Sequence, residues 1–67
     1  MDNSLKVWRA REDLTQEELA KEVDVSRQTI NAIERGKYDP SLELAFKLAN
    51  RFDCTIEEIF VFDPEAE

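Results

Sequence analysis

The segment SRQTINAIERG, residues 26–36, carries the signals of a short capped helix. Ser26 precedes the helical residues, and its hydroxyl can accept a hydrogen bond from the free backbone N–H groups of the first turn. Gly36 follows them, and glycine enters the left-handed conformation that ends many helices without steric cost. Ile30 and Ile33 lie three residues apart and therefore share one face. The segment predicts a helix over about residues 27–35 that is anchored through a single apolar face.

Polar side chains occupy the first turn of this helix, where packing alone does not explain them. They are Arg27, Gln28 and Thr29, with Asn31 just beyond. Arginine and glutamine carry paired donors and acceptors that match the edges of guanine and adenine in the major groove of DNA. We assign all four residues to base reading. A solvated helix end is the alternative for the first three, and a phosphate contact is the alternative for Asn31.

A second short helix precedes the first. Thr15 and Glu18 have the spacing of a capping box, in which each side chain bonds the backbone amide of the other residue. Leu19 and Val23 then lie at helical spacing, so this helix runs to about Val23. Only two residues remain before the Ser26 cap. Two helices joined so closely must cross at a steep angle, which is the geometry of a helix-turn-helix.

The rest of the sequence predicts three further helices around this pair. The first runs from about Asn3 to Glu12. Pro40 bars continuation of a helix, and Ser41 caps a fourth helix whose apolar stripe we assign to the core. That stripe consists of Leu42, Ala45, Leu48, Ala49 and Phe52. A further capping box at residues 55–58 opens a last short helix.

Three sequence blocks stand at characteristic separations along the chain. They are TQEELA at residues 15–20, V-S-x-x-x-I-x-x-I-E-x-G at 25–36 and P-S-x-x-x-A-x-x-L-A at 40–49. Together they resemble the lambda-repressor-like helix-turn-helix family, also called the Cro/CI or xenobiotic-response-element type, over about residues 5–60. The resemblance implies an all-α fold, a compact five-helix DNA-binding domain in which the second and third helices form the reading unit.

Further residues take roles from the resemblance or from their position. Gln16 opens the second helix, where the family uses a glutamine to bond a DNA phosphate at the positive end of the helix dipole. An ordinary surface amide is the alternative. Arg9 and Glu34 resemble a family pair that forms a partly buried salt bridge, so we assign them to structure. Three residues after the reading helix suit phosphate contacts, although the tyrosine could equally shield the core: Arg35, Lys37 and Tyr38.

The C-terminal segment departs from the pattern of a small helical domain. Residues 59–62 read IFVF, four apolar residues in a row, and acidic residues follow. We divide the chain into a DNA-binding domain, residues 1–60, and a tail, residues 61–67. Aromatic and β-branched residues favour an extended strand, which is expected to find no partner inside an all-helical fold. We therefore assign Phe60, Val61 and Phe62 to dimerisation, with Phe60 also completing the core. The alternative is a tail folded over its own core.

The net charge of −7 argues against DNA binding, because a DNA reader usually presents a basic patch. The distribution of charge weakens this objection. Residues 1–26 hold four basic and seven acidic side chains, and residues 38–67 hold two and eight. Residues 27–37 hold three basic side chains and one acidic, so the predicted reading helix and its loop are positive. An acidic body behind a basic face lowers nonspecific affinity, which comes mainly from phosphate neutralisation.

Composition gives little support to other classes of function. Sixty-seven residues make one small domain, without an apolar run near the ~20 residues that span a bilayer and without a signal-peptide pattern. The lone Cys54 fits a reducing cytosol and an ordinary partly buried thiol, with a reactive thiol as the alternative. With no histidine and one glycine, neither a metal site nor a nucleotide-binding loop is expected. No cofactor and no enzyme activity are predicted.

The sequence therefore predicts a cytoplasmic, sequence-specific transcriptional regulator, a repressor, that binds a double-stranded DNA operator as a homodimer. Two copies would read half-sites about one helical turn apart, roughly 34 Å. The alternative belongs to another class: a protein-interaction module, or an antitoxin-like protein, that uses the same fold to dock a partner. The acidic surface and the apolar tail motivate this alternative.

Overall fold

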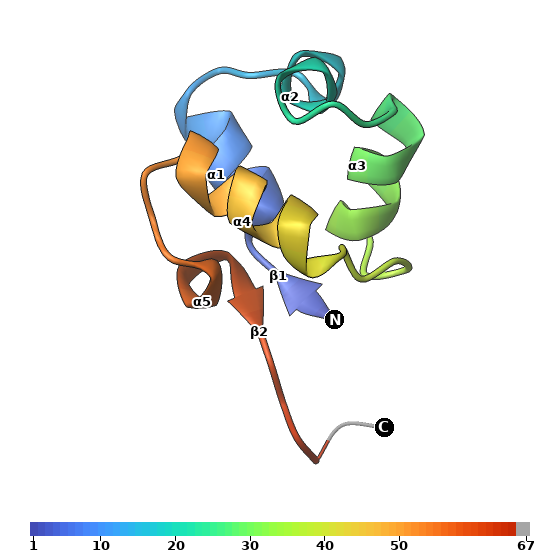
Figure 1. Cartoon of the computed structure of the whole chain (residues 1–67), viewed down its shortest axis with the longest axis vertical. Coiled ribbons are helices and arrows are strands. Elements are labelled where there is room, and N and C mark those ends of the chain that lie inside the picture. Colours follow the sequence, from blue (N-terminus) through green and yellow to red (C-terminus); the bar gives the residue numbers. More distant parts are fainter. Residues whose placement is uncertain (66–67) are drawn as a thin grey trace.

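The computed structural model describes residues 1–65, which form five short helices and one two-stranded sheet (Figure 1). The helices are α1 (Leu5–Arg11), α2 (Gln16–Glu22), α3 (Arg27–Glu34), α4 (Leu42–Arg51) and α5 (Ile56–Ile59). The strands are β1 (Asp2–Asn3) and β2 (Phe60–Val61). The predicted five-helix fold with a short C-terminal strand is confirmed.

Hydroxyl side chains begin the helices where the sequence predicts them. Ser26 and Ser41 each accept a hydrogen bond from the backbone amide three residues on, at 3.1 Å in both cases. At α2, the Thr15 hydroxyl accepts from the Glu18 amide at 3.0 Å, while the Glu18 carboxylate accepts from the Thr15 amide at 2.9 Å. This backbone bond is the main cause that lowers the pKa of the Glu18 carboxyl.

The first four helices end in the same way. The residue after the last turn adopts a left-handed conformation in each: Asp13 (φ 57), Asp24 (φ 64), Gly36 (φ 72) and Asp53 (φ 55). At α3, the Gly36 amide donates to the Ile33 carbonyl and the Lys37 amide donates to the Ala32 carbonyl, each at 2.9 Å. These paired bonds form a Schellman motif. The sequence pointed only to Gly36, because aspartate adopts this conformation less readily than glycine.

The core takes at least one fully buried side chain from every helix. These side chains are Leu5, Leu19, Ile30, Ile33, Leu48 and Ile59. Trp8 packs at the edge of this core, with its ring centroid 6.1 Å from that of Phe52. Its indole nitrogen donates to the Glu58 carbonyl at 3.2 Å, which ties α1 to α5. The tryptophan therefore joins the first and last helices at the edge of the core.

Two residues, Asn3 and Leu42, do not lie where the sequence predicts them. Asn3 lies in β1 rather than in the first helix, because its side chain bonds neighbours on both sides. Its amide nitrogen donates to the Ile33 carbonyl at 2.8 Å, and its side-chain oxygen accepts from the Leu5 amide at 3.1 Å. Leu42 is 70 % exposed rather than part of the core. It lies one turn before the exposed Phe46, on an edge of α4 that no other described element covers.

The C-terminal strand has a partner within the same chain, so the expectation that it would find none is wrong. β2 pairs antiparallel with β1, with Asp2 opposite Val61 and Asn3 opposite Phe60. Phe60 is 7 % exposed and belongs to the core, whereas Val61 and Phe62 are 58 % and 74 % exposed. Of the predicted tail, residues 66–67 lie outside the described residues.

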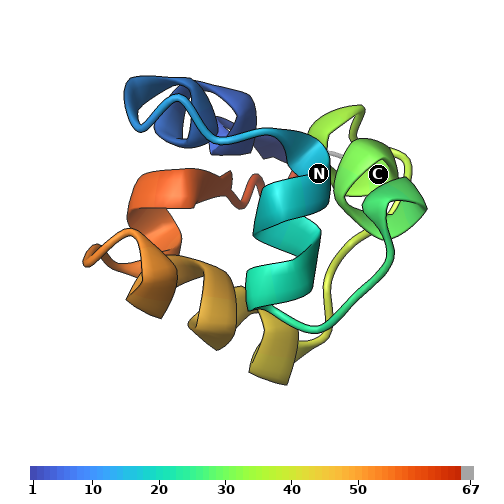
Figure 2. The ribbon, with the colours of Figure 1, turned by 90° about the horizontal axis from the view of Figure 1, so that it is seen from above.

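The arrangement of the helices places α3 and α5 far from one another. Figures 1 and 2 both place α3 at one edge of the molecule and α5 at the opposite edge. α2 packs against α3, as a helix-turn-helix requires. Within residues 1–65, no helix has the length and apolar character needed to cross a membrane, and no group of side chains could hold a metal ion.

Candidate nucleic-acid interface

α3 turns an apolar face inward and a polar face outward. Ile30 and Ile33 are fully buried. Helical spacing places Gln28, Ala32 and Arg35 in one row on the side away from them. Gln28 and Arg35 are exposed, and Ala32 is half-buried between them. The outward row therefore consists of two long polar side chains on either side of a methyl group.

Ala32 is the position in this row that sequence reasoning missed. Its signal was the spacing of four residues from Gln28, which puts both side chains on one helix face. A small apolar side chain in the major groove can contact the methyl group of thymine. Arg27 is exposed on the first turn beside Gln28. The exposed surface of α3 therefore combines hydrogen-bonding side chains with one apolar methyl group, that of Ala32.

Thr29 lies on another side of α3 from this row. Its hydroxyl is 3.0 Å from that of Ser26, so the two hydroxyls share a hydrogen bond at the helix cap. Thr29 also lines a hollow of about 260 Å³ together with Tyr38 and Leu44 of α4. Tyr38 is 48 % exposed there. The structure thus places Thr29 and Tyr38 along the same hollow, and their roles at DNA stay predictions.

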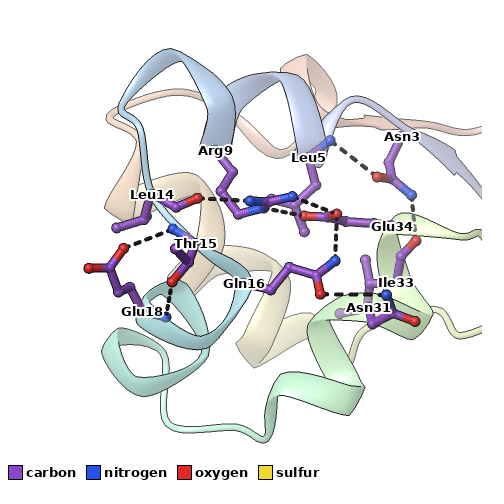
Figure 3. Close-up of polar contacts among 10 residues, drawn as sticks. All are labelled: Asn3, Leu5, Arg9, Leu14, Thr15, Gln16, Glu18, Asn31, Ile33 and Glu34. Carbon is purple, nitrogen blue, oxygen red and sulfur yellow. Dashed lines mark hydrogen bonds and ion pairs between the residues drawn. The ribbon is translucent and has the colours of Figure 1, made fainter.

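A polar network joins α1, α2 and α3 behind the outward row (Figure 3). Arg9 donates from Nε to Glu34 Oε2 at 2.8 Å and from Nη2 to Glu34 Oε1 at 3.2 Å. Its remaining nitrogen, Nη1, donates to the Leu14 carbonyl at 2.8 Å. Gln16 Nε2 donates to Glu34 Oε1 at 3.0 Å, and Asn31 Nδ2 lies 3.5 Å from Gln16 Oε1. Four of the residues singled out from sequence therefore meet in one cluster.

The Arg9–Glu34 pair is shielded from solvent. The side chain of Glu34 is 5 % exposed and that of Arg9 is 16 % exposed. The hydrogen bonding of Arg9 to the Glu34 carboxylate is the main cause that raises the pKa of the Arg9 guanidinium. Arg9 neutralises the single acidic side chain of residues 27–37. The charged groups that this segment exposes to solvent are therefore its cations. None of the ion pairs among the described residues involves Arg27, Arg35 or Lys37.

Within this network, the Gln16 side chain keeps one hydrogen-bond donor that can bind a group outside the protein. Its side-chain oxygen faces Asn31, and one N–H of its amide is bonded to Glu34. A glutamine amide has two N–H donors, so a second N–H remains without a partner among the described residues. Gln16 is half-buried at the first position of α2, and its amide is held by two neighbours. This orientation suits a donor that meets an anion at a set place.

The loop after α3 is held by the N-terminal strand. The Asn3 side chain bonds the Ile33 carbonyl in the last turn of α3, and the Lys37 amide bonds the Ala32 carbonyl. Arg35, Lys37 and Tyr38 follow from this fixed point with exposed side chains. The cations of the loop therefore lie next to the outward row of α3.

Two groups outside this surface are structural. Arg51 of α4 bonds Glu12 at 2.8 Å and also bonds Glu22, which ties α4 to α2 and to the end of α1. Cys54 is half-buried, and burial together with the nearby acids Glu58 and Asp53 raises the pKa of its thiol. A raised pKa lowers the thiolate fraction, so these surroundings favour the ordinary thiol over the reactive one.

Comparison with known proteins identifies the family. A family model described as helix-turn-helix matches residues 5–59. An uncharacterized HTH-type transcriptional regulator of Methanocaldococcus jannaschii is 60 % identical over 65 residues, which cover 97 % of this chain and 98 % of that protein. The uncharacterized HTH-type transcriptional regulator YgzD of Bacillus subtilis is 45 % identical over 65 residues, with the same coverage. The chain belongs to the Cro/CI-type, or lambda-repressor-like, helix-turn-helix family.

Solved structures share the arrangement of the helices. The restriction-modification controller protein C.AhdI of Aeromonas hydrophila has a TM-score of 0.76 and 34 % identity, over 84 % of this chain and 85 % of that one. The SOS-response transcriptional repressor LexA of Eubacterium rectale has a TM-score of 0.79 and 28 % identity, over 94 % of this chain and 66 % of that one. The fold predicted from the resemblance is confirmed by these structures.

Proposed function

We propose that this protein is a sequence-specific DNA-binding transcriptional regulator that reads the major groove with α3. The observation that carries the proposal is the outward row of α3, where Gln28 and Arg35 flank Ala32 in front of a closed salt bridge. Gln28 and Ala32 match the donors, acceptors and methyl groups of base edges, and Arg35 at the end of the row suits a phosphate. Membership of a family whose relatives are named transcriptional regulators supports it.

In the proposed complex, base readers and phosphate contacts come from different elements. Arg27 and Gln28 reach base edges from the first turn of α3, and Asn31 lies between these readers and Gln16. The second N–H of Gln16 donates to a phosphate where α2 crosses above the groove. Arg35 and Lys37 neutralise phosphates beside the loop. Phosphate contacts fix the register of the protein, and base contacts then specify the sequence.

We propose further that the protein acts as a homodimeric repressor in the cytoplasm. A single reading helix with so few cations binds weakly, and linking two half-site contacts raises the overall affinity steeply. Two copies related by a two-fold axis would read half-sites about one helical turn, roughly 34 Å, apart. A bound dimer can repress simply by occupying its operator.

Fluorescence anisotropy on labelled duplexes tests DNA binding directly. We expect affinity for a selected operator to exceed affinity for a scrambled duplex by at least about 1,000-fold. Arg27→Ala should reduce this ratio. Lys6→Ala, which removes an exposed cation of α1 instead, should leave the ratio unchanged. Equal affinity for both duplexes would contradict sequence-specific reading.

The second candidate function is a partner-binding module with the same fold. The acidic charge of residues 38–67 and the exposed apolar side chains of the C-terminal segment favour it. A monomer in solution without salt-dependent affinity for DNA would support this candidate over the first.

A further inference from the structure

The side chain of Asn3 joins the N-terminal strand to the starts and ends of two helices. Its amide nitrogen donates to the Ile33 carbonyl of α3 at 2.8 Å and to the Met1 carbonyl at 3.2 Å. Its side-chain oxygen accepts from the amide of Leu5, the first residue of α1, at 3.1 Å (Figure 3). Both N–H donors and the oxygen of the amide are therefore engaged, and only one orientation of the amide satisfies all three bonds.

Asn3 is itself held on the body of the domain. In the sheet it lies opposite Phe60, which belongs to the core. The next residue, Ser4, donates from its backbone amide to the carbonyl of the fully buried Ile59 at 2.8 Å. The position of the Asn3 side chain is therefore set by the core and not by the turn of α3 that it contacts.

The bond from Asn3 falls on the turn that closes α3, residues 33–37. The Ile33 carbonyl also accepts from the Gly36 amide at 2.9 Å, which is one of the two bonds of the Schellman motif. The chain before β1 runs close to the same turn, because the Met1 carbonyl oxygen lies 3.5 Å from the position that a Cβ on Gly36 would take. The exposed side chain of Lys37 comes directly after this glycine. The N-terminal strand therefore holds the turn from which the cations of the loop extend.

We infer that Asn3 is a positioning residue for DNA binding, which fixes this turn so that Arg35 and Lys37 meet the phosphates at a set place. The inference rests on the proposed function. A side chain on an ordered loop loses less conformational freedom on binding than one on a mobile loop, so its contact contributes more to affinity. A cap for α1 needs only the side-chain oxygen of Asn3, whereas the bond to Ile33 uses the nitrogen and spans 30 residues of sequence. Asn3 acts through the two cations and does not itself touch DNA.

A role at the phosphates predicts an effect that is independent of DNA sequence. Phosphate contacts fix the register of a protein on the duplex and carry no sequence information directly. Each contact contributes about 0.9 to the slope of log affinity against log salt concentration. Asn3→Ser keeps an acceptor near the Leu5 amide, but its hydroxyl ends one bond short of the nitrogen that reaches Ile33. It should lower this slope by about one and weaken binding at 0.1 M salt by about 10-fold, for operator and scrambled duplexes alike.

Salt titration by fluorescence anisotropy compares Asn3→Ser with a matched control, at a temperature where circular dichroism shows both variants folded. The control is Ser4→Ala, which removes a hydroxyl 3.2 Å from the Glu58 carbonyl and 3.4 Å from the Ile59 carbonyl. Both variants lose a side-chain bond to a backbone carbonyl, but only Asn3→Ser loses a bond to α3. Ser4→Ala should keep the slope of the parent. An unchanged slope in Asn3→Ser, the same fall in both variants, or a loss confined to the operator would overturn the inference.

A double-mutant cycle tests whether Asn3 acts through the cations. In a protein that already carries Arg35→Ala and Lys37→Ala, Asn3→Ser should cause no further loss of affinity for DNA, because the loop then has no cation left to position. A further loss as large as in the parent protein would contradict action through Arg35 and Lys37.

Hydrogen exchange in the free protein separates the contact from DNA binding. The Gly36 and Lys37 amides are bonded to carbonyls of α3. In Asn3→Ser they should exchange about 10-fold faster relative to the amides of α4, because one lost hydrogen bond shifts a local opening equilibrium by about that factor. Ser4→Ala should leave this ratio unchanged, and an unchanged ratio in Asn3→Ser would overturn the inference. A parent protein without salt-dependent affinity for DNA would reject the proposed function, whereas faster exchange would still show that Asn3 orders the turn.

Discussion

Replacing Glu34 by alanine should destabilise the domain by about 3 kcal/mol. The Glu34 side chain is 5 % exposed and accepts three hydrogen bonds, two from Arg9 at 2.8 and 3.2 Å and one from Gln16 at 3.0 Å. Removing one partner of a buried ion pair typically costs about 3–5 kcal/mol, because the other charge is left unpaired. Arg9 keeps its bond to the Leu14 carbonyl, which places the cost at the lower end of this range.

Urea unfolding provides the assay. A domain of this length has a stability of about 3–10 kcal/mol, so Glu34→Ala removes a large share of it. With a slope of about 1 kcal/mol per molar urea, the unfolding midpoint should fall by about 3 M. The matched control is Glu17→Ala, an exposed acid on α2 whose nearest cation, Lys21, is 4.0 Å away. An exposed pair of this kind is worth about 0–1 kcal/mol.

A Glu34→Ala midpoint that shifts no more than that of the Glu17→Ala control would refute the reasoning. A second variant separates unpaired charge from lost packing. Arg9→Met combined with Glu34→Leu replaces both charges by apolar side chains of similar size. It should recover part of the lost stability, because no buried charge then remains unpaired.

Three further predictions concern single side chains. Gln28→Ala should weaken binding to the selected operator by about 1–3 kcal/mol and relax the sequence preference at one base pair. An equal loss of affinity for every DNA sequence in competition assays would instead assign Gln28 to a contact with the DNA backbone. Lys37→Ala should weaken binding to all duplexes alike and reduce the salt slope by about one, and an unchanged slope in a salt titration would exclude this phosphate contact. The pKa of Glu18 is lowered in the folded state, so its capping box stabilises the fold above the unfolded pKa of about 4.3 and is lost as pH falls through the folded pKa. In Glu18→Gln, Tm should therefore fall less steeply as the pH decreases below about pH 5. The same dependence of Tm on pH as in the parent protein would contradict the assignment.

Local signals made most of the fold predictable from sequence. The side chains of Thr15, Ser26 and Ser41 act within three residues of themselves, so the sequence alone places the starts of α2, α3 and α4. The start of α1 was predicted wrongly, because it depends on contacts between residues far apart in the chain. Asn3 is held in β1 by Ile33 and by the strand at Phe60, and contacts that distant along the chain leave no local pattern.

In the candidate site, too, local sequence signals predict some features, whereas others depend on contacts between residues far apart in the chain. The caps and the apolar spacing of α3 identify its exposed first turn, including Gln28, without any structure. The link from Gln16 to Glu34 and Asn31 depends on how α2 crosses α3, and no spacing in the sequence reports that angle. Likewise the exposure of Leu42 depends on which edge of α4 other elements cover, although its spacing fits the buried stripe.

Selection of bound sequences from a random pool of duplex DNA tests the central claim most directly. If α3 reads bases as a dimer, the pool should yield two inverted half-sites about 10 base pairs apart, centre to centre. Repeating the selection with Gln28→Ala should change the preference at one base pair of each half-site and leave the spacing unaltered. A pool that yields no common sequence, or the same sequence with both proteins, would contradict reading by α3.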